Sequence, residues 1–482
     1  MNSPFARSRR LLFILIALAL VSNACISPRR TPNLEHIFAS ARSKTGKRPV
    51  IVIPGILGTE LINPKTGETV WPSAFRTSQE GLPISPDLAA NRDDLVPGKI
   101  VETVKLGRLI PEVYVYRDLL EALRRYAGYR DGDWANPAAD GYQDTFYVFA
   151  YDWRQDNVAN ARELIRRIEG LKNKLNHPDL KFNVLAHSMG GLIARYAAMY
   201  GDADLPAGEG PIQPTWSGAA HISKIVMIGT PNEGSADAFS SIVDGYSITE
   251  GLRRRIPLLN KLTAEDAVTA PSLFQLMPHQ QAVKFRDENL QTLDVDLYDA
   301  ESWKRYGWSV IYSSPDFRRR HEQSSGSDGL NSHANGLDTY LAATLRRARR
   351  FHQALDAVDS SNSPVVLLAI GGDCEETLNS PVILRDQKRN RWLTLTRPRE
   401  YRTANGSKIS KKAATEAMFA PGDGRVTRAS MLGENLFHTR DTQTGFTLSR
   451  YAIFACDLHG QLPRNKTLQD NALTAIVNEV MN

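Results

Sequence analysis

The chain has 482 residues, of which 42% are hydrophobic and 23% are charged. These proportions are typical of globular domains and exclude a disordered or fibrous chain, and at about 100–200 residues a domain the length allows one large domain or two to three smaller ones. The net charge of +6 is modest, and the sequence contains neither a nucleic-acid-binding motif nor zinc-type spacing among its three cysteines, so we expect no nucleic-acid partner, no metal and no cofactor.

The first 24 residues are typical of an export signal. Three arginines within residues 7–10 precede 11 apolar residues, Leu11–Val21, and a short run of small residues before Cys25. This apolar run is shorter than the about 20 residues that span a membrane, as in a secretory signal peptide. We expect Cys25 to be lipidated, as in a membrane-anchored lipoprotein of the periplasm, outer membrane or cell surface, although Ser22 stands where Leu is common. Soluble secretion after cleavage at the same bond is the alternative.

After a polar linker over residues 25–48, short apolar runs alternate with helical patterns. Continuous apolar runs are typical of strands buried on both faces, and the helical patterns place apolar residues at spacings of three and four. Together they predict an α/β fold, with a mostly parallel central sheet and helices on both faces. The predicted strands are 50–53, 145–150, 181–186, 224–229, 365–371 and 446–455, and the predicted helices are 116–126, 158–175, 192–199 and 468–481.

Two stretches interrupt this alternation. Residues 235–363 separate two predicted strands by far more than an ordinary connection, and their helical patterns and loops predict an inserted cap or lid. Residues 62–112 form a second, turn-rich insertion. The core is therefore predicted over residues 49–234 and 364–482.

The segment most indicative of chemistry is Ala186–Gly191, which follows an apolar strand and precedes a helix. This is the setting of a nucleophile elbow, whose tight turn requires small residues two positions before and two after the serine. Ala186 and Gly190 meet that requirement. The hydroxyl of Ser188 would then lie at a helix N-terminus, whose partial positive charge favours a developing oxyanion. Ser188 is the predicted nucleophile.

A serine hydroxyl needs a base, and the base needs an acid that orients it. In this architecture the acid and then the histidine follow the serine in the chain. Only His459 lies between the last predicted strand and the final helix, at the sheet edge where Ser188 is expected, so we predict that it is the base. The other histidines after the serine are His221, His279, His321, His333, His352 and His438.

The residues alone leave the acid open among three aspartates. Asp373 directly follows the strand at 365–371, Asp423 lies in a tight Gly-Asp-Gly turn, and Asp328 lies in a similar turn within the cap. The oxyanion hole needs two backbone N–H groups. The best candidates are Met189, after the nucleophile, and Ile56, in the glycine-rich loop that follows the first strand.

Two cysteines follow the last two predicted strands, Cys374 after one and Cys456 after the other. If those strands are neighbours, both thiols lie at the same edge of the sheet. Export implies an oxidising compartment, so we predict a disulfide between them that braces the loops carrying Asp423 and His459.

Together these segments resemble the lecithin:cholesterol acyltransferase family, and Tyr151-Asp152-Trp153-Arg154 is the most discriminating of them. The resemblance covers most of residues 49–480. It implies an α/β-hydrolase fold with a cap, lipid-ester chemistry and a Ser-Asp-His triad whose acid lies in Gly-Asp-Gly, hence Asp423. The other matching segments are Pro49–Leu61, Val70–Pro72, Ala186–Gly191, Gly229–Pro231, Pro271–Pro278 and His459.

Within this resemblance, Trp153 and Leu57 are predicted to contact the substrate, although a structural Asp152–Arg154 pair explains the segment that contains Trp153 equally well. Three departures leave the acyl acceptor and substrate open. Ala186 replaces the elbow glycine, and Gly424 is followed by Arg-Val-Thr where Thr-Val-Pro is commoner. The turn Gly229–Pro231 continues as Asn-Glu-Gly.

The sequence thus predicts a serine-dependent lipid acyl hydrolase or O-acyltransferase. It would act on lipid esters, phospholipid foremost, through an acyl-enzyme on Ser188, with a membrane or lipid surface as its partner. A general secreted carboxylesterase or triacylglycerol lipase of the same fold is the alternative. A third hypothesis is that the protein is not an enzyme but a catalytically silent lipoprotein that only binds lipid or a partner.

Overall fold

The computed structural model describes residues 31–72, 82–84, 95–104, 113–247, 261–279, 283–324, 336–357, 363–434 and 448–478. The predicted signal segment and Cys25 lie outside these residues. Among the helices in the described ranges, none combines the length and the apolar character that a membrane span requires.

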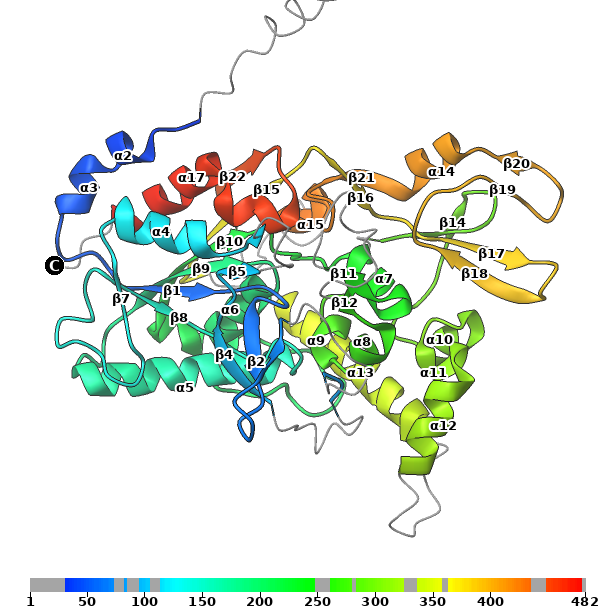
Figure 1. Ribbon diagram of the computed structural model, residues 1–482, viewed down its shortest axis with the longest axis horizontal. Coiled ribbons are helices and arrows are strands. Elements are labelled where there is room, and N and C mark those ends of the chain that lie inside the picture. The colour runs from blue at the N-terminus through cyan, green and yellow to red at the C-terminus, as the bar shows by residue number, and fades with distance from the viewer. Residues whose placement is uncertain are drawn as a thin grey trace, which may run out of the picture.

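The core is a seven-stranded sheet in which every neighbouring pair of strands runs parallel (Figure 1). Ile51 of β1 (Val50–Ile53) pairs with Val184 on one side and with Tyr147 on the other. The predicted α/β class is confirmed, and each of the six predicted strands is present within two residues of its expected ends. In sheet order the strands are β22 (Leu448–Ala455), β15 (Val366–Gly372), β10 (Ile222–Ile228), β9 (Phe182–His187), β1 (Val50–Ile53), β8 (Thr145–Val148) and β7 (Arg130–Asp131).

Helices cover both faces of this sheet because apolar side chains point to both faces. Along β1, Ile51 and Ile53 belong to one buried cluster, and Val50 and Val52 belong to the other, as the two-residue repeat of a strand requires. The first face packs against α5 (Asn157–Leu175), α6 (Met189–Tyr200) and α13 (Gly336–Leu355), and the second against α4 (Arg117–Arg125) and α17 (Lys466–Val477) (Figure 1).

Smaller elements flank the sheet. The turn-rich insertion contributes a three-stranded sheet in which β2 lies between β3 and β4. These flanking elements are α2 (Leu34–Ile37), α3 (Ala39–Ser43), β2 (Thr59–Ile62), β3 (Thr69–Trp71), β4 (Val96–Ile100), β5 (Thr103–Val104), β6 (Val113–Tyr114), the 3₁₀ helix η1 (Ser217–Ala220), α15 (Arg428–Leu432) and the 3₁₀ helix η4 (His459–Arg464).

The chain between β10 and β15 builds a mainly helical region beside the sheet (Figure 1). Its interior is aromatic, with Phe239, Phe285, Trp303 and Trp308 in mutual ring contact. Its elements are α7 (Ala236–Asp244), β11 (Tyr246–Ser247), β12 (Lys261–Leu262), α8 (Ala264–Val268), α9 (Pro271–Phe274), β13 (Phe285–Arg286), β14 (Thr292–Leu293), α10 (Ala300–Tyr306), α11 (Val310–Ser313), α12 (Pro315–Ser324) and α13.

A second excursion lies between β15 and β22, within the region that the sequence assigned to the core. We call residues 382–412 of this excursion the arm; it lies at the end of the molecule far from β7 (Figure 1). The arm joins the cap because β17 pairs with β13. The excursion contains β16 (Glu375–Leu378), β17 (Val382–Asp386), β18 (Arg391–Leu395), β19 (Tyr401–Arg402), β20 (Lys408–Ile409), α14 (Lys411–Met418) and β21 (Phe419–Gly422).

Candidate active site

Ser188 occupies the sharp turn between β9 and α6. Its backbone has φ 54° and ψ −125°, a region that a residue with a side chain rarely adopts. The turn is held by the N–H of Ser188, which donates to the carbonyl of Ile228 at 2.8 Å. A methyl group on Gly190 would lie 2.7 Å from the carbonyl oxygens of Ile53 and Pro54. A side chain at position 190 would therefore collide with the end of β1, which is why the elbow requires a small residue there.

The structure brings Ser188, His459 and Asp423 together at the carboxyl ends of the strands. His459 Nε2 lies 2.9 Å from Ser188 Oγ, and His459 Nδ1 lies 2.7 Å from Asp423 Oδ2. All three residues are buried, with Asp423 completely inaccessible. These are the contacts that a nucleophile, a base and an orienting acid require.

The surroundings of Asp423 fix the protonation pattern of this chain of contacts. Its Oδ1 accepts backbone N–H groups from Arg425 at 3.0 Å and Val426 at 2.8 Å, and the N–H of His459 donates to the Asp423 carbonyl at 2.8 Å. An ionised carboxylate only accepts hydrogen bonds, so His459 carries its proton on Nδ1. Its Nε2 is then free to accept the proton of Ser188.

A second hydrogen-bonded chain lies behind the serine and was not foreseen from the sequence. The N–H of Gly55 donates to the Tyr116 hydroxyl at 2.7 Å, and that hydroxyl lies 2.7 Å from His187 Nδ1. The other ring nitrogen of His187 lies 3.2 Å from the carbonyl oxygen of His459. His187 thus joins the loop after β1 to the backbone of the predicted base.

The loop Gly55–Gly58 and the start of α6 present the predicted oxyanion donors. Leu57 has φ 64°, and the Tyr151 hydroxyl holds the loop by donating to the Pro54 carbonyl at 2.8 Å. Within the described residues, the N–H groups of Ile56 and Met189 donate to no protein acceptor. Met189 is completely buried and Ile56 partly so, and buried N–H groups are rarely left unpaired. These two groups therefore fit the role predicted for them, which stays a prediction.

The other candidates for base and acid take different partners. Asp373 lies 3.5 Å from Arg428, His221 contacts Lys172 at 3.2 Å, and His279 stacks on His352 with ring centroids 4.2 Å apart. His321 lies on α12. His333, His438 and Asp328 lie outside the described residues.

Cys374 and Cys456 form a disulfide with their Cα atoms 5.1 Å apart. They follow β15 and β22, which are neighbours in the sheet. The disulfide lies close to the predicted acid and base, because β16 begins directly after Cys374 and its Glu375 bridges to Asp423.

A small cavity of about 40 Å³ lies against Ser188 and His459. Typical small-molecule sites measure about 300–1,000 Å³, so this cavity has no room for a long acyl chain in the observed conformation. An ion pair lies in its wall, with Arg425 2.6 Å from Asp237. The other lining residues are Ile56, Pro231, Ser235, Ala238, Ser241, Leu273, Leu276 and Val426.

Trp153 and Leu57, the predicted substrate contacts, do not line this cavity. Trp153 is completely buried, packs edge-on against Trp71 at 5.6 Å and donates to the carbonyl of Thr59. In the same segment, Arg154 and Asp152 form the structural pair considered above, with two hydrogen bonds of 3.0 and 2.8 Å. Substrate contact by Trp153 and Leu57 stays a prediction.

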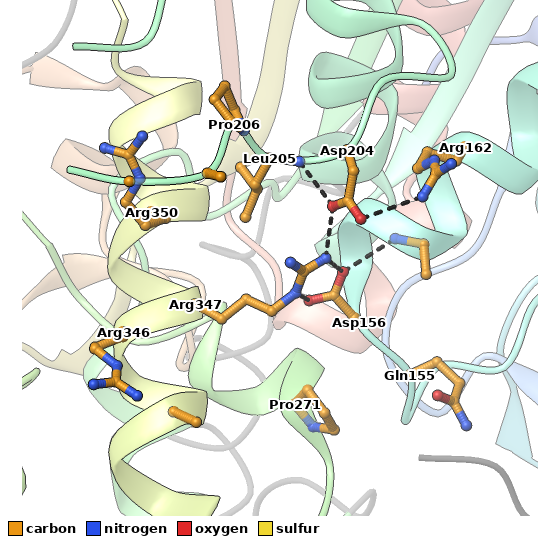
Figure 2. Close-up of a pocket in the computed structure, with 14 residues that line it drawn as sticks. Gln155, Asp156, Arg162, Asp204, Leu205, Pro206, Pro271, Arg346, Arg347 and Arg350 are labelled. Carbon is orange, nitrogen blue, oxygen red and sulfur yellow. Dashed lines mark hydrogen bonds and ion pairs between the residues drawn. The ribbon is translucent and has the colours of Figure 1, made fainter. Parts of the chain in front are cut away.

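A larger cavity of about 820 Å³ lies where α13 meets the core (Figure 2). Arginines project into it, but ion pairs neutralise much of their charge. Arg347 makes two hydrogen bonds to Asp156, at 2.8 and 2.9 Å, and one to Asp204 at 2.9 Å, and Arg162 also contacts Asp204. This network fastens α13 to the N-terminus of α5.

Sequence reasoning missed three parts of the site. Tyr116 carried no motif that linked it to Ser188, and His187 was noted only as part of the elbow. The ion pair of Arg425 and Asp237 could have been suspected, because Arg425 stands at one of the departures from the family pattern.

Comparison with known families locates the resemblance in the middle of the chain. The family model described as lecithin:cholesterol acyltransferase matches residues 134–324, so the resemblance is confirmed there. This stretch contains Ser188 and most of the cap but ends before Asp423 and His459. An uncharacterized protein of Saccharomyces cerevisiae, YJR098C, is 23% identical over 305 residues, which are 62% of this chain and 39% of that protein. The chain therefore spans about two fifths of the length of that curated relative.

Solved structures are similar to this chain to different degrees. The Tle4–Tli4 complex matches with a TM-score of 0.51 at 15% identity, covering 90% of this chain and 99% of that chain. EstA from Clostridium botulinum matches with a TM-score of 0.33 at 15% identity, covering 94% and 92%. The Staphylococcus hyicus lipase matches with a TM-score of 0.31 at 12% identity, covering 93% and 97%. The seven-stranded parallel sheet and the first of these matches give the α/β-hydrolase fold.

Proposed function

We propose that this chain is a serine-dependent lipid acyl hydrolase or O-acyltransferase, starting from the match of residues 134–324 to the lecithin:cholesterol acyltransferase family. The observation that carries the proposal is the relay from Ser188 through His459 to Asp423, at 2.9 and 2.7 Å. The relay has the donors and acceptors in the order that acyl transfer needs.

In the proposed reaction, His459 Nε2 takes the proton of Ser188 as Oγ bonds to the ester carbonyl carbon. The oxyanion forms within reach of the N–H groups of Ile56 and Met189. The tetrahedral intermediate then collapses, and the departing alcohol takes the proton from His459, which leaves the acyl group on Ser188. Water or a second alcohol attacks that ester by the same steps in reverse, giving a free acid or a new ester.

The cavity chemistry supports a substrate that is apolar in one part and charged in another. Leu273, Leu276 and Ile56 offer apolar surface, whereas Arg425 brings a guanidinium that matches a phosphodiester. Binding a phosphate there would compete with Asp237 for Arg425. We therefore place phospholipids ahead of uncharged glycerides, and expect Arg425→Met to lower phospholipid turnover more than diacylglycerol turnover, with Arg428→Met as the control.

The test uses the purified protein and a phospholipid with a labelled acyl chain, with and without a sterol or another alcohol. Separating free acid from new ester distinguishes hydrolysis from acyl transfer. A fluorophosphonate should label Ser188, and Ser188→Ala should abolish both labelling and turnover. Ser240→Ala, which changes a buried serine outside the cavity lining, should leave both intact. An active Ser188→Ala variant would end the proposal.

One observation favours the second candidate, a general carboxylesterase or triacylglycerol lipase. The 40 Å³ cavity fits the acyl part of a short soluble ester more readily than a lipid tail. Turnover of short esters, with none of phospholipid in vesicles or micelles, would select this candidate. If the relay were intact and neither class of ester were turned over, the chain would fit the silent lipid-binding lipoprotein instead.

We also propose that residues 1–24 direct export and that Cys25 receives a lipid. The support is the basic and apolar pattern of the segment and its small residues before Cys25. Mass spectrometry of the mature N-terminus measures this directly. A lipid-modified N-terminal Cys25 is the expected result, and an unmodified N-terminus at the same residue would mean soluble secretion.

A further inference from the structure

The arm holds a concentration of positive charge that the rest of the chain lacks. Residues 382–412 contain ten Lys and Arg and two acidic residues, a net charge of +8. The whole chain carries +6, so the other 451 residues together carry −2. The positive charge of this protein is therefore a property of the arm.

The folding of the arm turns its apolar residues inward and its cations outward. Val382, Leu384 and Leu395 are buried together with Tyr401, and β17 pairs with β18 in an antiparallel ladder. The alternation of side chains along the strands and the tight turns leave the basic residues at the surface. The exposed cations are Lys388, Arg389, Arg391, Arg397, Arg399, Arg402, Lys408, Lys411 and Lys412.

Few of these cations are neutralised within the protein. Arg391 lies 3.9 Å from Asp386, Lys408 lies 3.0 Å from Glu400, and Lys412 lies 3.9 Å from Glu416. Among the residues that the structure describes, no carboxylate pairs with the side chains of Lys388, Arg389, Arg397, Arg399 or Lys411. Their field therefore extends into the solvent over about a Debye length.

The arm is also built into the wall of the candidate active site through α7. Ser235, the N-cap of α7, and Asp237 and Ser241 within α7 line the cavity. At the C-terminal end of the same helix, the Thr396 hydroxyl of the arm donates to Asp244 at 2.8 Å. Ala236 is also buried in the apolar cluster of the arm. A surface that binds the arm would therefore lie close to α7, the helix that contributes to the wall of the cavity.

We propose that the arm docks this protein onto an anionic lipid surface, an inference that rests on the proposed action on lipid esters. Basic residues near such a surface each contribute about 1 kcal/mol, and they need no complementary shape. A protein partner would require an apolar interface core, but the exposed large apolar residues in the described ranges, Ile37, Val96 and Val366, lie outside the arm. A single-stranded nucleic acid would require exposed aromatic rings, whereas Tyr401 is buried and Trp392 is covered by Arg385 and Tyr306.

The test is sedimentation with vesicles of phosphatidylcholine alone or mixed with phosphatidylglycerol, using the full chain with Cys25→Ser so that no lipid anchor contributes. The arm variant combines Lys388→Glu, Arg389→Glu, Arg397→Glu and Arg399→Glu. The control variant reverses four exposed cations elsewhere, Arg42, Lys44, Lys65 and Lys99, to Glu. Both variants change the net charge equally, so they differ only in where the reversed charges lie.

We expect the unaltered chain to bind anionic vesicles, to release them at high salt and not to bind neutral vesicles. The arm variant should bind at least a hundredfold more weakly, since four charges at about 1 kcal/mol each are reversed. The control variant should lose less than tenfold. Turnover of a short soluble ester should be equal in all three, which separates docking from chemistry.

Equal binding of the two vesicle types, or equal losses in the two variants, would overturn the inference. So would retention of an acidic protein by the arm when anionic vesicles are not bound. Binding of anionic vesicles by the arm without turnover of any lipid ester would leave the docking surface standing and would instead contradict the proposed function.

Discussion

At the scale of single residues, the hydrogen-bond directions around His187 allow one arrangement. His187 Nε2 lies against the carbonyl oxygen of His459, which can only accept, so Nε2 carries a proton and donates it. In a neutral ring Nδ1 is then an acceptor, so the Tyr116 hydroxyl, which accepts the N–H of Gly55, donates its own proton to His187 Nδ1. Burial, reinforced by the neighbouring His459, holds the pKa of His187 well below its usual range, so the ring is neutral as this arrangement requires.

This arrangement predicts that Tyr116→Phe impairs turnover without touching the substrate. The variant leaves the Gly55 N–H and His187 Nδ1 buried without their partner, at a cost of about 1–3 kcal/mol. Because both groups position the active-site loop and His459, we expect kcat for a soluble ester to fall about tenfold with little change in KM. The rate at which a fluorophosphonate labels Ser188 should fall in parallel.

Tyr129→Phe is the matched control for that experiment. Its hydroxyl donates to the Arg48 carbonyl at 3.2 Å, and its ring belongs to the core cluster that contains α4 and α17. This variant should lower the free energy of unfolding and leave kcat unchanged. If Tyr116→Phe likewise lowered only the free energy of unfolding and left kcat unchanged, the positioning role of Tyr116 and His187 would be ruled out.

At the scale of elements, one carboxylate joins three helices. Asp156 caps the N-terminus of α5 by accepting the N–H of Ala159 at 3.1 Å. It also accepts a hydrogen bond from Gln275, directly after α9, at 2.6 Å. Two more come from Arg347 of α13 (Figure 2). Since Leu273 and Leu276 beside Gln275 line the small cavity, Asp156 anchors the apolar part of the candidate site to the core.

We predict that Asp156→Ala lowers the free energy of unfolding by about 2–4 kcal/mol. It removes a helix cap, worth about 1 kcal/mol, and leaves a largely buried Arg347 without its main partner. Asp204→Ala should cost less than about 1 kcal/mol, because its side chain is 49% exposed. Urea unfolding of the two variants measures both values, and equal losses would contradict the anchoring role of Asp156.

The sequence predicted the sheet well because its strands are buried on both faces, which produces continuous apolar runs. It placed the serine and the histidine correctly at one sheet edge, since the elbow motif and the position after the last strand are local signals. The choice of Asp423 over Asp373 needed the family resemblance, because both aspartates follow turns near the same edge. In the arm, β19 and β20 escaped prediction because they are two residues long, too short for a periodic pattern.

At the scale of the whole molecule, three histidines with a lowered pKa make stability depend on pH. Burial lowers the pKa of His187 and of His352 well below the usual range, with help from His459 and His279 respectively. Burial, with the nearby Lys172 and Lys181, lowers the pKa of His221 to about 4. Each ring is neutral in the folded protein but takes up a proton in the unfolded chain below about pH 6.5. Stability is therefore present above pH 6.5 and is lost as the pH falls.

We predict that the free energy of unfolding falls between pH 6.5 and 4.5 by as much as about 1.4 kcal/mol per pH unit for each of these histidines. Carboxyl groups with a lowered pKa, such as Glu163 and Asp204, lose their contribution only below their ordinary values of 4.5 and 3.8, so this window belongs to the histidines. His221→Gln should reduce the slope by about a third, because one of three titrating rings is removed. Urea titrations at half-unit steps of pH measure the slope, and an unchanged slope in His221→Gln would show that the acid sensitivity has another source.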